Sequence, residues 1–73
     1  MSLPRLLALS EITASEPAFP KLVEDYVVAL SKGSKWAPIV CTRTFAGFIV
    51  KDGNHRVAAA RQLGHGFIWA VVR

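Results

Sequence analysis

The sequence predicts a single small α/β (α+β) domain, residues 1–73, with the element order β-α-β-β-α-β. Four short apolar segments have the composition of strands, and two further stretches carry apolar residues at helical spacing. Gly33 and Gly64 stand where those two helices are expected to stop. Hydrophobic residues make up 52% of the chain and charged residues 19%, which excludes a disordered chain.

The first half of the chain is predicted to hold a strand and a helix. Arg5–Leu9 is a short apolar run that favours a strand, and Ser10–Phe19 is expected to be a polar connection. Pro20 suits a first helical turn, and Lys32-Gly33 ends the helix. The apolar stripe of this helix consists of Leu22, Val23, Tyr26, Val27 and Leu30.

A β-hairpin is predicted next. Trp36–Thr42 favours a strand with Pro38 near its start, Thr44–Gly47 is a turn, and Phe48–Val50 is a second apolar strand. This second strand leads directly into Asp52-Gly53, so a helix is expected to follow.

The last helix and strand complete the order. Val57, Ala60 and Leu63 fall on one helical face, and Phe67–Val72 is expected to be a buried strand inside the sheet. The same order also suits a ferredoxin-like fold, so the pattern alone leaves the topology open.

Charge and cysteine content limit the partners and the compartment. The net charge of +4 favours anionic partners such as a nucleotide, DNA or an acidic protein, although the basic residues are spread along the chain. The single cysteine, Cys41, excludes an internal disulfide and a CxxC metal site and fits a cytoplasmic protein. No apolar run approaches the length of a spanning helix, so no membrane partner is expected. A domain this small buries only about 60% of its unfolded surface, which makes a homo-oligomer plausible.

The segment Asp52-Gly53-Asn54-His55-Arg56 is the candidate site for chemistry. A helix start exposes unpaired N–H groups and the positive end of a dipole, and Gly53 lets the backbone approach an anion closely. Asn54 is expected to cap the helix, and His55 and Arg56 add donors beside the same position. Asp52 has two open roles, binding Mg²⁺ next to a phosphate or fixing the turn. The alternative to a binding site is that this segment is only a capped turn and binds no ligand.

Residues 49–64, IVKDGNHRVAAARQLG, resemble the signature stretch of ParB-type N-terminal domains, which form one superfamily with sulfiredoxin. An apolar strand leads into a glycine turn, then into an alanine-rich helix that ends in Leu-Gly, and Phe67–Val72 fits the strand that follows. Leu9–Ile12 and Ala37–Val40 resemble earlier segments of the family, so the similarity covers nearly the whole chain. The resemblance implies a mixed sheet.

This resemblance implies a nucleotide-binding domain in which Gly53, Asn54, His55 and Arg56 hold the phosphates of ATP or CTP, with Mg²⁺ near Asp52. Some members hydrolyse nucleoside triphosphates or phosphorylate free serine. The serine-kinase branch carries D-G-H-H-R at this turn and a catalytic glutamate after its first strand. Glu16 is therefore the expected base, together with Asp52 at the catalytic centre, and Glu11 is the rival to Glu16.

Two other branches fit less well. Sulfiredoxins carry a catalytic cysteine where this chain has Asn54, which argues against sulfinic-acid reduction. Chromosome-partitioning members carry Arg-Arg in place of His55-Arg56 and continue into a helix-turn-helix, and recognition of a DNA operator is not expected for this chain. A DNA-binding or nuclease module, and a protein-interaction module with an inert site, remain the alternative functions.

For the remaining candidates, a structural role is preferred to a functional one. His65 is explained by the dipole at a helix C-terminus, Trp36 and Trp69 by packing, and Arg61 by solvation. Arg43 and Lys51 flank the hairpin and are expected to be solvated, although either can add charge to the site. The two histidines and one cysteine do not have the spacing of a zinc site.

Overall fold

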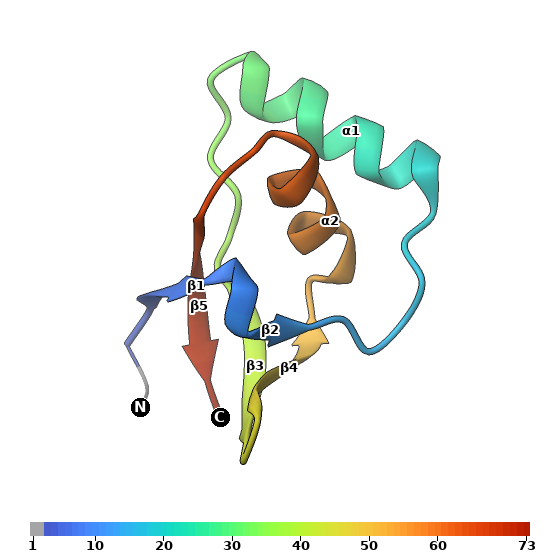
Figure 1. The fold of residues 1–73 in the computed structure, drawn as a ribbon. Helices are drawn as coiled ribbons and strands as arrows, with labels where there is room; N and C mark the ends of the chain where they lie inside the picture. Colours follow the sequence, from blue (N-terminus) through green and yellow to red (C-terminus); the bar gives the residue numbers. More distant parts are fainter. Residues whose placement is uncertain (1–2) are drawn as a thin grey trace.

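The computed structural model describes residues 3–73, which form a five-stranded sheet and two α-helices (Figure 1). The elements follow the chain in this order: β1 (Arg5–Ala8), a 3-10 helix (Leu9–Glu11), β2 (Ile12–Thr13), α1 (Pro20–Ser31), β3 (Ile39–Thr44), β4 (Gly47–Asp52), α2 (Asn54–Gln62) and β5 (Phe67–Val72). The predicted α/β class and element order are confirmed.

The sheet is mixed, with the strand order β1-β5-β3-β4-β2. β3 and β4 form the predicted antiparallel hairpin, β1 pairs antiparallel with β5, and β5 runs parallel to β3. At the other edge, β2 runs parallel to β4 through the pairs Ile12–Phe48 and Thr13–Ile49. β5 lies between β1 and β3, so the prediction that the last strand is inside the sheet is confirmed. It is not buried throughout as predicted, because Ile68 and Ala70 face the core whereas Phe67 and Trp69 are exposed on the other face.

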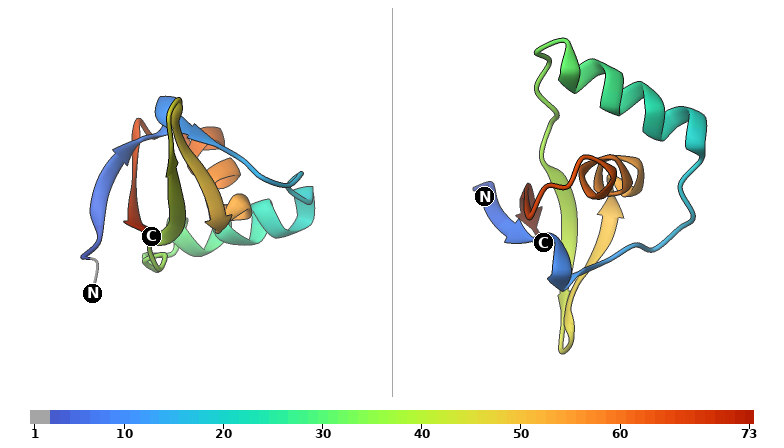
Figure 2. Two further views of the ribbon diagram at one scale, coloured as in Figure 1. Left: turned by 90° about the horizontal axis from the view of Figure 1, so that it is seen from below. Right: turned by 45° about the horizontal axis from the view of Figure 1, so that its top comes forward.

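Helix α2 packs its Val57 and Ala60 against the buried face of the sheet. That core takes side chains from every strand, including Leu7, Ile12, Ile39, Cys41, Phe48, Val50, Ile68 and Ala70. α1 packs mainly against α2, and Figure 2 shows it on the far side of α2 from the sheet. Of the apolar stripe of α1, Val23 is buried, whereas Leu22 and Tyr26 keep 44% and 36% of their surface exposed.

The structure corrects the expected polar connection at Ser10–Phe19. Its first part contains the end of the 3-10 helix and the short strand β2, and Ile12 within it is buried. A two-residue strand is too short to produce a periodic pattern, which is why the sequence predicts only a connection there. The expected helix ends are confirmed, with Gly33 and Gly64 at φ of 89° and 77°.

Within residues 3–73, neither helix is long and apolar enough to span a bilayer.

Candidate functional site

The start of α2 depends on Gly53, which links β4 to the helix. Gly53 has φ of 118°, and its carbonyl accepts the first helical hydrogen bond from the Val57 N–H at 2.9 Å. A Cβ atom at this position would lie 2.5 Å from Cγ2 of Ile39, a residue with no exposed surface. Both the backbone conformation and the packing therefore require glycine here.

Three backbone N–H groups at this helix start have no partner in the part of the chain that the structure describes. They belong to Asn54, His55 and Arg56, and no side chain caps the helix. Unpaired N–H groups at a helix N-terminus carry partial positive charge and point away from the helix body, so they form a ready site for an anion.

The Asn54 side chain does not cap α2, which corrects the expectation. Asn54 is the first helical residue rather than the cap, and it is only 9% exposed. Its Oδ1 accepts hydrogen bonds from the N–H groups of Ser15 (2.9 Å) and Glu16 (3.4 Å), and its Nδ2 donates to Ser15 Oγ at 3.2 Å. Asn54 thus fastens the connection before α1 to the helix start. Ser15 carries no sequence signal for this role, because its partner is 39 residues away.

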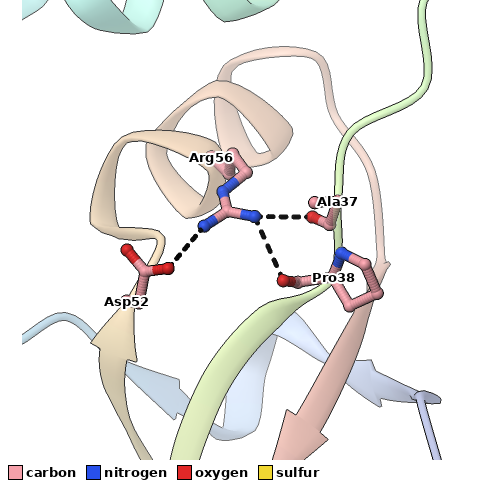
Figure 3. A network of polar contacts seen from close by, with 4 residues as sticks. All are labelled: Ala37, Pro38, Asp52 and Arg56. Carbon is pink, nitrogen blue, oxygen red and sulfur yellow. Dashed lines mark hydrogen bonds and ion pairs between the residues drawn. The ribbon is translucent and has the colours of Figure 1, made fainter.

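Arg56 is buried, at 8% exposure, and its guanidinium lies between Asp52 and the carbonyls of Ala37 and Pro38 (Figure 3). Nη1 donates to the carbonyls of Ala37 (2.7 Å) and Pro38 (3.1 Å), and Nη2 lies 3.3 Å from Asp52 Oδ2. Arg56 therefore joins the chain entering β3 to the end of β4. The Asp52 side chain is 75% exposed, so this ion pair borders solvent. Arg56 Nε is buried without a partner among the described residues.

His55 lies against Phe19, with ring centroids 5.7 Å apart and planes inclined by 24°. Its Nε2 is buried and has no hydrogen-bond partner within residues 3–73. A buried ring nitrogen without a partner is costly in free energy, so an acceptor or donor from a ligand would stabilise it. Phe19, which the sequence places in the polar connection, is thus a neighbour of the site that sequence reasoning missed.

The structure separates the two candidate glutamates. Because β2 runs parallel to β4, the chain that follows Thr13 travels toward Asp52 and the start of α2. The Glu16 N–H accordingly lies 3.4 Å from Asn54 Oδ1, and the Glu16 residue is exposed. Glu11 lies at the other end of β4, where its carbonyl oxygen approaches Gly47. Glu16 borders the helix start and Glu11 does not.

Of the other basic candidates, Arg43 and Arg61 lie away from the α2 start, whereas Lys51 lies three residues before it. The Arg43 guanidinium stacks on the Phe48 ring at 4.8 Å, near the beginning of β4. Arg61 is exposed but donates to the carbonyls of Leu9 (3.2 Å) and Ile12 (2.6 Å), so it is not simply solvated as expected. Lys51 is exposed near the end of β4.

Cys41 is fully buried in β3, and burial raises the pKa of its thiol. The residue is therefore part of the core, which agrees with its predicted place in a strand. No cluster of three or more His, Cys, Asp or Glu side chains that could hold a metal occurs within residues 3–73.

Comparison with solved structures decides between the topologies that the sequence left open. Free serine kinase in complex with AMP superposes with a TM-score of 0.87 over 96% of this chain, at 20% identity. Sulfiredoxin from Arabidopsis thaliana superposes at 0.81 over 97% of this chain, at 19% identity. The chain has the ParB/sulfiredoxin-like fold.

The ParB/sulfiredoxin-like fold is also that of the C-terminally truncated ParB from Caulobacter crescentus complexed with CTP-gamma-S, with a TM-score of 0.78 at 17% identity. The domain spans 84% of the length of sulfiredoxin, 43% of that ParB chain and 30% of the free serine kinase chain. No protein-family model and no curated protein matches the sequence.

Proposed function

We propose that this domain binds a nucleotide through its phosphates at the N-terminus of α2. The observation that carries the proposal is the set of three unpaired backbone N–H groups of Asn54, His55 and Arg56, which follow a glycine turn without a side-chain cap. Such a set matches the oxygens of a phosphate and adds the positive end of the helix dipole.

Two side chains add to this site. His55 contributes a buried Nε2 that has no partner among residues 3–73. Arg56 contributes its backbone N–H and its fixed positive charge, while its guanidinium holds Ala37, Pro38 and Asp52 in place. Arg56 is therefore a positioning residue in this proposal, and Gly53 allows close approach of the ligand.

The solved neighbours support a nucleotide over an inorganic anion. Free serine kinase was solved with AMP and ParB with CTP-gamma-S, and both share the fold of this chain. ATP and CTP are accordingly the first ligands to test.

A magnesium ion fits this site only together with the phosphates. Asp52 is the single carboxylate at the turn, and it faces Arg56 through Oδ2, which leaves Oδ1 for a cation. Because Mg²⁺ is commonly held by one or two carboxylates together with substrate phosphates, Asp52 would hold it once a nucleotide is bound. The ion would neutralise phosphate charge there.

We further propose that Glu16 is the base for hydrolysis or phosphoryl transfer. Its backbone is held at the helix start through Asn54 and its side chain belongs to an exposed residue, so a hydroxyl or water near the phosphates is accessible to it. Glu16→Gln is expected to abolish turnover while nucleotide binding persists, and Glu11→Gln is the matched control that keeps both.

Binding is tested by a thermal-shift panel of ATP, CTP, GTP and pyrophosphate with and without Mg²⁺. At about 100 times its dissociation constant, a ligand adds roughly 2.7 kcal/mol, which raises the Tm of so small a domain by on the order of 10 °C. His55→Glu and His55→Gln form the matched pair, because both remove the ring and only the first adds a charge that repels phosphate. The proposal predicts that His55→Glu loses the shift and His55→Gln keeps part of it. Equal shifts in both variants, or no shift in the wild type, would contradict it.

A further inference from the structure

A concavity lies beyond the C-terminal end of α2. It has a volume of about 390 Å³, and its lining includes Leu6, Lys35, Trp36, His65, Phe67 and Trp69. His65 follows the C-terminus of α2, and Ala37, another lining residue, accepts a hydrogen bond from Arg56 at 2.7 Å. The cavity therefore extends from the end of α2 toward the Arg56 guanidinium. Figures 1 and 2 show β1, β5 and the chain that leaves α1 meeting on this side of the domain.

The walls formed by β1 and β5 are apolar and unusually exposed. Leu6, Phe67 and Trp69 keep 54%, 60% and 54% of their surface accessible. Leu6 is paired with Trp69 and Ala8 with Phe67, so these side chains belong to neighbouring positions of the two strands. Several large apolar side chains that surround one cavity mark a binding site more often than a plain surface.

The opposite wall is held in place before any ligand arrives. Trp36 donates from its indole Nε1 to the Tyr26 carbonyl at 3.1 Å and packs edge-on against the Tyr26 ring, with centroids 6.1 Å apart. The His65 ring lies 6.2 Å from the Trp36 ring at a tilt of 42°. An aromatic wall fixed by a hydrogen bond costs little entropy when a flat ligand packs on it.

Lys35 is the one charged side chain among the lining residues that the structure describes. Lys35 is positively charged and His65 supplies a ring nitrogen, whereas no Asp or Glu is found among the lining residues that the structure describes. An apolar cavity of this size with one cationic side chain matches a small ligand with an aromatic body and a carboxylate.

We infer that this cavity, here called the Trp36–Trp69 pocket, binds a small aromatic carboxylic acid. The aromatic body packs between Trp36 and the side chains of Phe67 and Trp69, and the carboxylate lies toward Lys35. The inference does not rest on the nucleotide proposal. Residues 53–56 do not line this pocket, although the lining residue Ala37 accepts a hydrogen bond from Arg56.

The test is an NMR titration of the ¹⁵N-labelled domain with 2-naphthoate, with 2-naphthamide as its neutral match. Trp36 and Trp69 are the only tryptophans in the sequence, so each indole N–H gives a separate reporter on one wall. Both indole signals and the amides of His65 and Phe67 are expected to shift with 2-naphthoate. The amide is expected to bind about fivefold more weakly, since it lacks the charge that pairs with Lys35.

Two lysine variants separate a specific ion pair from general attraction to a basic protein. Lys35→Ala is expected to weaken 2-naphthoate binding about threefold, the size of one partly exposed ion pair, and to leave 2-naphthamide unaffected. Lys21→Ala removes a lysine of α1 that does not line the pocket, and it is expected to leave the affinities for 2-naphthoate and 2-naphthamide unchanged. Equal affinity for the acid and the amide, shifts centred on residues 54–56, or equal effects of the two variants would overturn the inference.

Discussion

At the scale of single residues, Gly53 is the position on which the helix start depends most. We predict that Gly53→Ala destabilises the domain by about 2–4 kcal/mol, because the new Cβ both strains a positive φ and collides with Ile39. Gly64→Ala separates the two causes, since Gly64 also has a positive φ but no atom lies within 4 Å of its added Cβ. It is expected to cost only about 1 kcal/mol in urea unfolding. Equal costs at the two positions would show that the contact with Ile39 is unimportant.

Arg56 offers a second test at this scale. We predict that Arg56→Lys destabilises the domain by about 1–2 kcal/mol although the charge is kept. The single ammonium nitrogen of lysine cannot replace the two guanidinium nitrogens that bind Asp52 and the carbonyls of Ala37 and Pro38. Lys21→Ala, which breaks the exposed pair with Asp25, should leave the stability almost unchanged in the same denaturation experiment. An unchanged stability of Arg56→Lys would contradict the positioning role of the guanidinium.

Cys41 predicts a pH dependence of stability. Burial raises the pKa of its thiol, so the folded state keeps the proton at a pH where the unfolded chain releases it. The free energy of unfolding should therefore fall as the pH rises through the usual range of a free thiol, and Cys41→Ala should remove this component. Labelling of the native protein by a thiol reagent is expected only through unfolding, which a comparison of labelling and unfolding rates will check.

At the scale of elements, Asn54 joins the connection before α1 to the start of α2. We predict that Asn54→Ala destabilises the domain by about 1–2 kcal/mol and speeds proteolysis between Thr13 and Pro20, because the Ser15 and Glu16 N–H groups lose their acceptor. Ser15→Ala, which removes only the bond from Nδ2, should have the smaller effect on both readouts. A larger effect of Ser15→Ala than of Asn54→Ala would contradict this prediction, because the Ser15 hydroxyl rather than the Asn54 amide would then be the main contact.

The elements that the sequence predicted are those with local signals. The strand β5 and the hairpin of β3 and β4 have apolar runs and turn residues of their own, and α1 and α2 are followed by glycines with positive φ. β2 was missed because a two-residue strand exists only through its pairing with β4. For the same reason the sequence indicated the turn at Gly53 but not its long-range contacts, such as Asn54 with Ser15 or Arg56 with Ala37.

At the scale of the whole molecule, the basic side chains behind the net charge of +4 lie in different surroundings. Arg56 is buried, Arg61 is bound to backbone carbonyls, and Arg5 and Arg43 lie over the Phe48 ring. The charge therefore supports the fold at several places, in addition to its effect on anionic partners. The two proposed sites lie at the two ends of α2, the phosphate site at its start and the Trp36–Trp69 pocket beyond its end.

The central claim is that a nucleotide binds by its phosphates at the start of α2, and backbone amide NMR during titration with Mg²⁺-ATP and Mg²⁺-CTP tests it most directly. With at least one of the two nucleotides, we predict that the largest shifts fall on the amides of Asn54, His55 and Arg56, with smaller changes at Ser15 and Glu16. Shifts centred instead on Trp36 and Trp69, or no saturable change at the α2 start with either nucleotide, would contradict it.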